Sequence, residues 1–310
     1  MWGWVLLPTT SDSDLTLSGF AEDELAKLLK SLDVREKREK VETFDVEAAL
    51  EAARAATRAK RGELWALGDH RLLVGDATDV DDVSRLFGDR KAVLMATDPP
   101  YLVNYQGGNH PQSKSNSRKT KDKHWDDYHD PDAAVEFFAK FIAAALPHLI
   151  PTAAIYQWHA HKRQALVERA WTESGLLVHQ QIIWAKSHGV LTHSHYLWSH
   201  EPCFYGWVEG QKPKRKPPSN QTTVWNIESE SLGVHPTQKP LEIFARPLEY
   251  HTEPGDLCYE PFLGSGTQLI AAEKLGRVCY GLELDAHYAS VVLARWESFS
   301  GQEALCLNRP

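Results

Sequence analysis

The sequence predicts an α/β protein built on a doubly wound, mostly parallel sheet with helices on both faces. From residue 64 onward, short apolar runs alternate with segments of helical periodicity. The runs are apolar throughout, as expected of parallel strands that are covered on both faces. No internal repeat is visible. Regular alternation of strands and helices is typical of a doubly wound sheet.

Residues 1–62 differ from the rest of the chain and are predicted to form a helical arm or linker. The stretch 21–32 carries leucines at helical spacing, and the stretch 46–62 is rich in alanine and charge, which favours a helix. There is little here to make a core. We therefore expect an arm of residues 1–62 that packs on, or leads into, a main domain of residues 63–310.

The predicted elements of the main domain follow one another along the chain. Strands are expected at 70–76, 91–98, 153–160, 176–186, 201–208, 256–262 and 277–285. Helices are expected at 81–89, 132–149, 162–175 and 264–276. Two more are expected after the turn that begins at 235 and from the end of the last strand to about residue 299. Residues 102–131 are polar and without periodicity, and so long a loop is usually functional or disordered.

The composition is that of an ordinary globular protein. Of 310 residues, 42% are apolar and 25% are charged, which argues against a wholly disordered chain. No apolar run reaches the roughly 18 residues of a membrane-spanning helix, and the first residues do not resemble a secretory signal, so we expect a cytoplasmic protein. Four scattered cysteines are expected to be reduced core thiols rather than disulfides or metal ligands: Cys203, Cys258, Cys279 and Cys306.

Basic residues gather in two segments although the net charge is −8. A local basic stripe matters more for binding phosphates than net charge does, so DNA or RNA is a candidate partner, and solvated loops are the alternative. The segments lie within 102–130 and 185–220, which we expect to contact DNA. Their residues are Lys114, Arg118, Lys119, Lys121 and Lys123, and Lys212, Lys214, Arg215 and Lys216.

The first chemical motif is a glycine turn between a strand and a helix, EPFLGSGT at 260–267. Glycines at 264 and 266 let a backbone approach a ligand closely, and Glu283, nineteen residues after Gly264, can accept both hydroxyls of a ribose. Leu269 stands where a dinucleotide fingerprint has its third glycine, which favours a nucleoside without phosphates. A tight turn that needs no ligand is the alternative.

The second motif is Asp98-Pro99-Pro100-Tyr101 at the end of a predicted strand. Each proline fixes φ and removes an N–H, so the segment is stiff. The Asp98 carboxylate and the Pro99 carbonyl can then accept the two hydrogens of an amino group on a planar ring, which stacks on Tyr101. A proline-rich turn into a loop is the alternative.

With both motifs, the chain resembles the S-adenosylmethionine-dependent DNA amino-methyltransferases, and more narrowly their β order class, in which DPPY precedes the FxGxG loop. The resemblance covers about residues 64–300, through LWALGDHRLLVGDAT, TDPPY, AAIYQWHA, SHEPCFYGW, QTTVWN, HPTQKP and EPFLGSGT to YGLELD. The arm at 15–62 resembles the linker that joins a ParB-like nuclease domain to the methylase in phage and prophage members. We expect no such nuclease domain in this chain.

The resemblance implies a Rossmann-like methyltransferase fold with a circularly permuted motif order and one antiparallel strand. It assigns the ribose to Glu283, the adenine amino group to Asp76, and the cofactor carboxylate to Thr237 and Lys239. Glu260 stands where the family more often has Asp, and Leu102 where many members have Asn or Gly. The implied catalytic positions are Asp98, Pro99, Pro100 and Tyr101. The implied cofactor positions are Asp76, Ala77, Thr237, Lys239, Glu260, Pro261, Phe262, Gly264, Ser265, Gly266, Thr267 and Glu283.

The implied activity is methyl transfer from S-adenosylmethionine to the exocyclic nitrogen N-6 of adenine in DNA, as in restriction–modification. The target base must be flipped out of the duplex. N-4 of cytosine is the alternative within the family, where SPPY is commoner. Methylation of RNA or of a protein glutamine, where NPPY is typical, and a non-enzymatic module that senses the cofactor or binds DNA are the alternatives outside it. A homodimer is left open.

Two further patterns, a Pro-Cys pair and a group of histidines, could indicate a cysteine nucleophile or a metal site. Pro202-Cys203 is similar to the nucleophile of enzymes that methylate carbon-5 of cytosine, but it precedes the glycine loop and lies in an apolar strand, so a structural thiol is expected. Four histidines lack the HExxH register and an acid at a ligand interval, so no metal site is expected, only loop histidines near a polyanion. These are His188, His193, His195 and His200.

Overall fold

The computed structural model describes residues 22–102, 130–190, 195–216, 220–228 and 239–308. Contacts divide the chain into two compact units, Met1–Val41 and Glu42–Pro310. In the first unit, the structure describes the helix α2 (Glu22–Glu39), on which Leu29 and Leu32 are exposed. No helix in the described ranges has the length and apolar character needed to cross a membrane.

The second unit is built on a sheet of ten strands among the residues described, in the order β10-β1-β2-β9-β8-β3-β4-β6-β5-β7. The five strands from β2 to β4 in this order are parallel neighbours, and β6 runs antiparallel to both β4 and β5. The strands are β1 (Leu64–Leu67), β2 (His70–Val74), β3 (Ala92–Thr97), β4 (Leu149–Trp158), β5 (Leu176–Val190), β6 (Trp198–Val208), β7 (Val224–Asn226), β8 (Leu257–Glu260), β9 (Val278–Glu283) and β10 (Leu305–Cys306).

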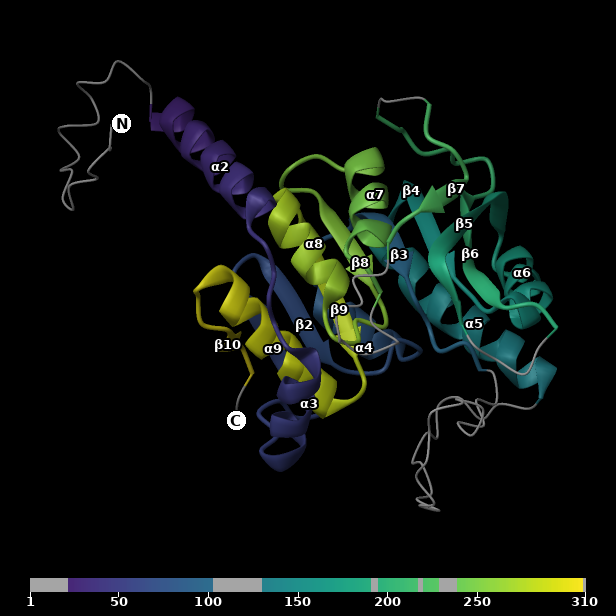
Figure 1. Ribbon diagram of the computed structural model, residues 1–310, viewed down its shortest axis with the longest axis horizontal. Coiled ribbons are helices and arrows are strands. Elements are labelled where there is room, and N and C mark those ends of the chain that lie inside the picture. The colour runs from purple at the N-terminus through teal and green to yellow at the C-terminus, as the bar shows by residue number, and fades with distance from the viewer. Residues whose placement is uncertain (1–21, 103–129, 191–194, 217–219, 229–238, 309–310) are drawn as a thin grey trace. The chain divides into compact units, whose positions relative to one another are not determined.

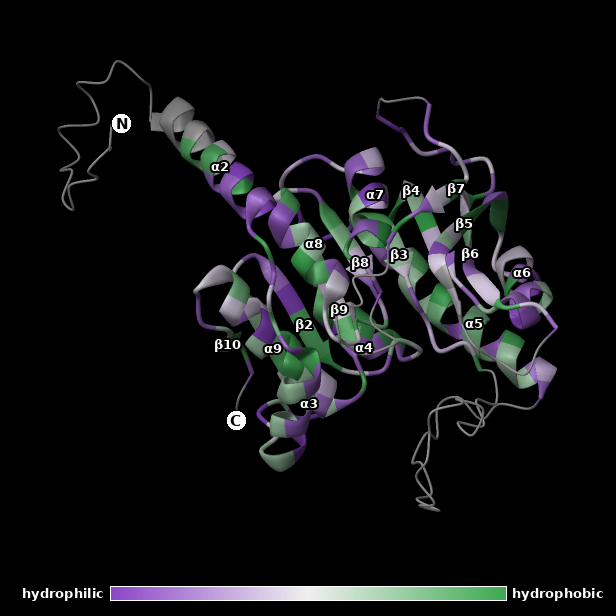
Figure 2. Ribbon diagram, in the orientation of Figure 1, coloured by the Kyte–Doolittle hydropathy of each residue, from purple (hydrophilic) through white to green (hydrophobic). Residues whose placement is uncertain are grey.

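Helices cover both faces of this sheet (Figure 1). One buried cluster joins the sheet to α7, α8 and α9, and a second joins its other face to α4, α5 and α6. Figure 2 shows apolar residues concentrated in the central strands and in the inner sides of the helices around them. The helices are α3 (Val46–Ala55), α4 (Val80–Phe87), α5 (Pro131–Ala145), α6 (Gln164–Glu173), α7 (Glu242–His251), α8 (Thr267–Leu275) and α9 (Ala286–Ser300).

The predicted mostly parallel α/β fold is confirmed, and every predicted strand of the central sheet is present. The expectation of one antiparallel strand was too low, because β1 also runs antiparallel to β2. These two strands form a hairpin whose turn contains Gly68 at φ +58°, a conformation that glycine adopts without strain. The strands β1, β7 and β10 have two to four residues each, too few to show a periodic pattern.

The arm predicted for residues 1–62 divides differently in the structure. The helix α3 ends at Ala55 rather than at residue 62, and it packs its Val46 and Leu50 against Val291 of α9. The chain beyond it stays attached, since Ser290 accepts the backbone N–H groups of residues 58 and 59. Residues from Glu42 onward therefore belong to the large unit, because α3 buries its apolar face there.

Candidate active site

The carboxyl ends of four neighbouring parallel strands bring the predicted acidic residues to one edge of the sheet. Asp76 follows β2, Glu283 ends β9, Glu260 ends β8 and Asp98 follows β3. The strand β8 lies between β9, which follows it in the sequence, and β3, which precedes it. The order of the strands in the sheet therefore reverses at β8. Ligands of open α/β sheets bind in the crevice at such a point.

The loop after β8 depends on its two glycines. Gly264 and Gly266 have φ of +54° and +88°, which other residues adopt only with strain. A Cβ at Gly266 would lie 3.3 Å from both methyl groups of Val292, so this position needs glycine for space as well. A Cβ at Gly264 would meet nothing within 4 Å, and the loop backbone is therefore open to a ligand on that side.

Glu283 faces this loop and has remaining capacity to accept hydrogen bonds. Its Oε2 accepts the N–H of Gly264 at 2.7 Å, and its Oε1 accepts the N–H of Asp285 at 2.9 Å. Burial raises the pKa of Glu283 to about 7. Each carboxylate oxygen has a second lone pair, so the pair of oxygens fits two neighbouring hydroxyls such as those of a ribose.

Asp76 shapes the turn after β2. Its Oδ1 accepts the N–H of Thr78 at 2.9 Å and the hydroxyl of Thr78 at 2.8 Å. Its own N–H donates to Asp82 Oδ2 at 2.9 Å. Asp76 is half-buried and Ala77 is buried beside it. These bonds fix the carboxylate at the sheet edge next to Glu283, since the N–H of Gly75 donates to the backbone carbonyl of Glu283 at 3.1 Å.

Glu260 links the loop to the neighbouring strand rather than facing solvent. Its Oε1 accepts the hydroxyl of Thr97 at 2.6 Å and the N–H of Phe262 at 3.0 Å. Its Oε2 is buried without a hydrogen-bond partner, and burial raises the pKa of Glu260 well above its usual value. Thr97 immediately precedes Asp98, so Glu260 ties the glycine loop to the end of β3.

Arg295 supports the glycine loop from α9, a contact that the sequence analysis did not identify. Its guanidinium donates to the carbonyl of Ser265 at 3.0 Å and to the hydroxyl of Thr267 at 3.2 Å. Glu42 accepts from the same guanidinium through both carboxylate oxygens, at 2.5 and 2.9 Å. Arg295 is 1% exposed, so these acceptors satisfy a buried charge.

Asp98 and Tyr101 lie beside a lysine that comes from the HPTQKP segment. The Nζ of Lys239 is 3.3 Å from Asp98 Oδ1 and 2.7 Å from the Tyr101 hydroxyl oxygen. It is 5.0 Å from the centroid of the Tyr101 ring, so the ammonium lies at the hydroxyl end of that ring. The Tyr101 hydroxyl donates to Glu201 Oε2 at 3.0 Å, and Glu201 also pairs with Lys239.

Burial and neighbouring charges act against each other in this cluster. Burial raises the pKa of Asp98, the charge of Lys239 lowers it and the charge of Glu201 raises it, and the outcome is a raised pKa. Burial also acts to raise the pKa of Glu201, but Lys239 and Lys186 outweigh it and lower that pKa to about 2. Glu201 is therefore ionised, and Asp98 takes up a proton more readily than an exposed aspartate does.

The residue after the DPPY motif has a strained backbone conformation. Leu102 has φ +51°, which makes it the non-glycine residue with left-handed φ in the described part of the chain. Gly and Asn adopt this conformation more easily than other residues. The Leu102 side chain is fully buried in the cluster beneath α5, so its packing offsets the backbone strain.

Glu201 and Lys186 were missed by the sequence analysis. Lys186 lies in the C-terminal part of β5 and Glu201 near the beginning of β6, where Trp184 pairs with Glu201. Because β6 is antiparallel, its beginning lies at the sheet edge where β3 and β5 end. Both strands also contain other polar residues, so no local pattern singles out this pair.

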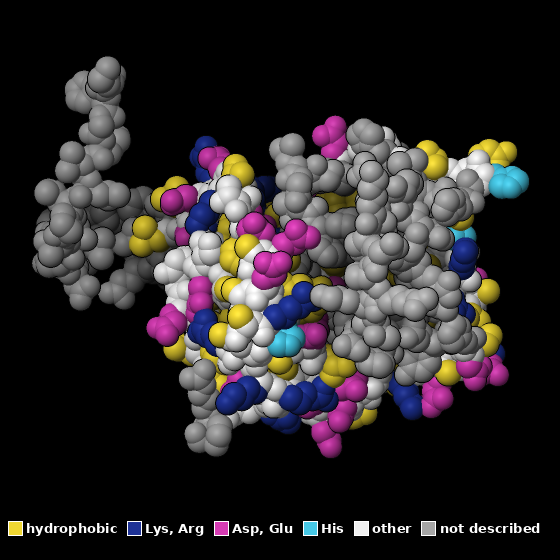
Figure 3. All heavy atoms as spheres, turned by 60° about the horizontal axis from the view of Figure 1, so that its bottom comes forward, with side chains coloured by type: hydrophobic (Ala, Val, Ile, Leu, Met, Phe, Trp, Pro, Cys, Tyr) yellow, Lys and Arg dark blue, Asp and Glu magenta, His cyan; other side chains and the backbone are white. Residues whose placement is uncertain are grey.

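The structure describes only the second of the two predicted basic segments. Thr237 and all five residues of the first segment lie outside the described residues. In the second segment, Lys212, Lys214 and Arg215 are exposed, whereas the Lys216 ammonium donates to the Thr252 carbonyl at 2.5 Å and pairs with Glu253. Figure 3 shows Lys and Arg side chains interspersed with Asp and Glu on the coloured part of the face that it presents.

The structure describes the predicted thiol and part of the histidine pattern. Cys203 is buried in β6, and burial raises its thiol pKa well above its usual value. All four cysteines are free. His193 lies outside the described residues. Within the described ranges, no three His, Cys, Asp or Glu side chains are arranged to hold a metal ion.

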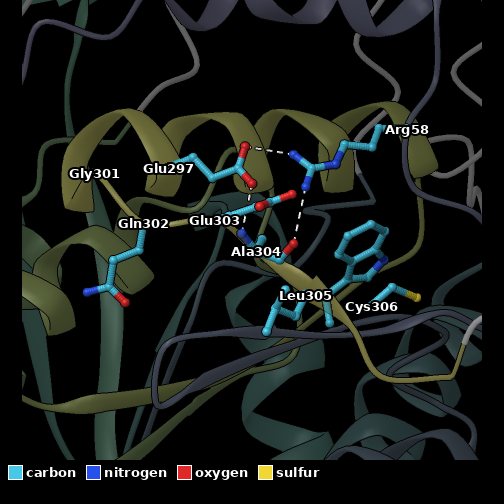
Figure 4. Close-up of a pocket in the computed structure, with 9 residues that line it drawn as sticks. Arg58, Glu297, Gly301, Gln302, Glu303, Ala304, Leu305 and Cys306 are labelled. Carbon is cyan, nitrogen blue, oxygen red and sulfur yellow. Dashed lines mark hydrogen bonds and ion pairs between the residues drawn. The ribbon is translucent and has the colours of Figure 1, made fainter.

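A pocket of about 680 Å³ lies away from this edge, beside β1 and β10 (Figure 4). The Arg58 guanidinium crosses it and donates to Glu297 at 2.7 Å and to the carbonyl of Ala304 at 3.2 Å. Arg58 and Glu297 thus hold the segment that precedes β10 to α9, and none of the predicted site residues lines the pocket.

Comparison with known proteins assigns the site to a family. Residues 93–294 match the model of the N6/N4 DNA methylases, described as "DNA methylase", and this range is most of the chain. The chain belongs to this family. The methylase is 25% identical over 222 residues to the type II methyltransferase M2.DpnII of Streptococcus pneumoniae, an alignment that spans 66% of this chain and 82% of that protein. It is 33% identical over 96 residues to M.SmaI of Serratia marcescens, 30% and 33% of the two chains.

Solved structures agree on the fold. The M1.HpyAVI–SAM complex superimposes with a TM-score of 0.55 at 22% identity, covering 72% of the methylase and 97% of that chain. The PvuII cytosine-N4-specific DNA methyltransferase superimposes with a TM-score of 0.58 at 16% identity, covering 79% and 98%. The Rossmann-like methyltransferase fold is therefore confirmed. The sheet order, with β8 after β3 in the chain but beside it in space, agrees with the permuted motif order.

Proposed function

We propose that the methylase transfers a methyl group from S-adenosylmethionine to N-6 of adenine in DNA. The observation that carries the proposal is the position of Asp98. Its Oδ1 is buried and pairs with the Lys239 ammonium only at the long distance of 3.3 Å, so the oxygen can still accept a hydrogen bond from a substrate N–H. Asp98 follows β3, the sheet neighbour of the strand that carries the glycine loop.

The residues at the other end of this edge suit the cofactor. Glu283 would accept the ribose hydroxyls, Asp76 the adenine amino group, and the loop around Gly264 would hold the methionine end. The orphaned Oε2 of Glu260 and the open space above Gly264 fit a polar ligand at the loop. The structural neighbour M1.HpyAVI was solved with SAM. When bound, S-adenosylmethionine supplies an electrophilic methyl group on a sulfonium.

Asp98 and the Pro99 carbonyl then act on the target amino group. The amino lone pair is delocalised into the base, so this nitrogen is a poor nucleophile. Two acceptors that hold its N–H bonds localise the lone pair and stabilise the positive charge that develops on nitrogen. Pro99 is buried and has no N–H, so its carbonyl is held in place by a stiff segment. Transfer of the methyl group would leave the cofactor as the neutral thioether S-adenosylhomocysteine, and the methylated nitrogen then loses its extra proton to water.

The base can reach Asp98 only when it is out of the duplex. We propose that it stacks on Tyr101, and that the regions 102–130 and 185–220 contact the DNA backbone. The exposed Lys212, Lys214 and Arg215 supply cations for this purpose. A homodimer is a further proposal, and the molar mass of the protein in solution tests it.

Cytosine N-4 is the second candidate target, because the PvuII enzyme that shares the fold is cytosine-N4-specific. The experiment is to methylate unmodified DNA with the purified protein, digest it to nucleosides and separate them by mass spectrometry. We expect N-6-methyldeoxyadenosine that depends on S-adenosylmethionine. N-4-methyldeoxycytidine would replace the adenine assignment by the cytosine one, and no methylated nucleoside would overturn the proposed activity. Carbon-5 methylation lost in Cys203→Ser would contradict the mechanism.

A further inference from the structure

Lys239 lies on the base side of the site, although the family resemblance assigns it to the cofactor carboxylate. Its ammonium contacts Asp98, Tyr101 and Glu201 at once, and its side chain is 12% exposed. Trp158 and Trp184 flank it, with ring centroids 5.9 and 5.8 Å from Nζ. These contacts hold the ammonium at the end of β3 and leave it little freedom to move.

Four charged side chains make a balanced cluster here. Asp98 and Glu201 carry negative charges, and Lys239 and Lys186 carry positive ones, with side-chain exposures between 12 and 23%. Lys186 pairs with the other oxygen of Glu201, so that carboxylate bridges the two lysines. Charges enclosed in this way interact more strongly than they do in water, and removing one leaves another unpaired.

Asp98 faces several other titratable groups. Glu201 repels its charge, and the Tyr101 hydroxyl and the Cys203 thiol lie near it with their pKa values raised by burial. Glu260 on β8 is a further neighbour, and burial and the charge of Asp98 both raise the pKa of that carboxyl. In the part of the chain that the structure describes, Lys239 is the cation that pairs directly with Asp98.

We propose that Lys239, anchored by Glu201, keeps Asp98 ionised for methyl transfer and is a positioning residue on the base side of the site. The inference rests on the proposed function. A protonated Asp98 would still accept a hydrogen bond, but it could not neutralise the positive charge that develops on the amino nitrogen. Without Lys239, burial and Glu201 would both favour the protonated form.

The test is the pH dependence of the single-turnover rate of methyl transfer, measured with saturating cofactor and DNA. In Lys239→Met the acidic limb of the profile should move to higher pH by at least about one unit, a tenfold change in the proton affinity of Asp98. Lys239→Arg keeps the charge, so the acidic limb of its pH profile should stay close to that of the wild type. Lys140→Met removes an exposed lysine that pairs with Glu136 on α5, and it serves as the matched control.

The double variant Lys239→Met/Glu201→Gln tests the anchor. Once Lys239 is gone, Glu201 only repels Asp98, so its neutralisation should move the acidic limb partly back toward the wild type. The double variant leaves one acid, Asp98, and one base, Lys186, so it restores the charge balance of the cluster and keeps the test valid if the single variant folds poorly. Thermal unfolding checks each protein before the kinetics.

Calorimetry of S-adenosylmethionine binding tests the alternative role of Lys239, which is to bind the cofactor carboxylate. The dissociation constant should change less than about twofold in Lys239→Met, because the ammonium acts on Asp98. If the acidic limb of Lys239→Met coincides with that of the wild type, the inference is overturned. If its dissociation constant for S-adenosylmethionine is also raised more than tenfold, Lys239 binds the cofactor carboxylate instead. A wild-type protein that methylates no DNA would instead overturn the proposed function.

Discussion

The two halves of the site differ in how their polar groups are held. The proposed cofactor half, at the ends of β2, β9 and β8, uses backbone: Glu283 accepts two N–H groups, and the loop passes through two left-handed glycines. The proposed target half, at the ends of β3 and β5 and the beginning of β6, uses side chains: Lys239 pairs with Asp98 and Glu201, and Lys186 pairs with Glu201.

This difference suits what each half must do. A backbone cradle presents a fixed shape, which is appropriate to a cofactor that is the same in every cycle. An ion cluster instead sets the charge of one carboxylate at the place where charge develops during the reaction. Changes in the cofactor half should therefore act on binding, and changes in the target half on rate.

The largest effect is expected from Asp98→Ala in the target half. Loss of one electrostatic stabiliser of the transition state should lower the single-turnover rate by at least about a hundredfold. Binding of S-adenosylmethionine, measured by calorimetry, should stay nearly unchanged. Wild-type activity in this variant would remove Asp98 from the reaction, and a lost cofactor affinity would erase the distinction between the two halves.

Glu283→Ala should break the cofactor half and weaken S-adenosylmethionine binding by roughly 1 to 3 kcal/mol, because charge-assisted hydrogen bonds to the ribose are lost. Calorimetry on the folded variant measures this directly. The rate at saturating cofactor should fall much less than in Asp98→Ala. Unchanged affinity would exclude Glu283 from the cofactor site.

The raised pKa of Glu283 makes the same contact sensitive to pH. With a pKa of about 7, the carboxylate is ionised above pH 7 and becomes protonated as the pH falls through that value. Cofactor affinity should therefore be fully present above about pH 7 and decrease below it, by at most about tenfold per pH unit. Glu283→Gln should flatten this dependence between pH 5.5 and 7.5, and Asp98→Asn should preserve it.

The sequence predicted the cofactor half better than the target half, for a physical reason. Gly264, Gly266 and Glu283 belong to one strand–turn–helix–strand unit, so their spacing along the chain already reflects their positions in space. Asp98 was found because the two prolines mark it. Glu201, which pairs with Lys239 beside Asp98, and Lys186, which pairs with Glu201, come from other strands, and only the sheet order brings them together.

The fold, like the site, was predicted where the evidence is local in the sequence. Apolar runs identified the central strands, whereas β10 has only two residues and joins the sheet by pairing with β1. The contact between Glu42 and Arg295 joins residues 253 positions apart in the sequence, and no local pattern indicates it. Spacing therefore predicts contacts within one supersecondary unit, and contacts between units require the assembled structure.

That remote contact offers a smaller perturbation of the cofactor half. Arg295→Met should leave the carbonyl of Ser265 and the carboxylate of Glu42 without their donor, and should weaken S-adenosylmethionine binding by about 1 kcal/mol, or roughly fivefold. Glu42→Gln, which keeps an acceptor, should have a weaker effect. The matched control is Arg169→Met on α6, where the arginine pairs with acids at the exposed surface. Equal cofactor affinity in all three variants would show that the loop holds its shape without Arg295.

The smallest effect is expected at the second basic segment, which lies outside both halves. Lys212 and Lys214 are exposed, and if each meets a DNA phosphate, changing both to Gln should lower the slope of log K against log salt by up to about 1.8, at roughly 0.9 per contact. Lys216→Gln is the control within the same segment, because its ammonium already bonds the Thr252 carbonyl and Glu253. Fluorescence anisotropy of labelled duplex between 50 and 200 mM salt, roughly the range in which phosphate contacts change affinity most visibly, measures the slopes. If the double variant keeps the wild-type slope, the segment does not contact DNA and is a solvated loop. If Lys216→Gln lowers the slope as much, the Lys216 ammonium must leave Glu253 when DNA binds.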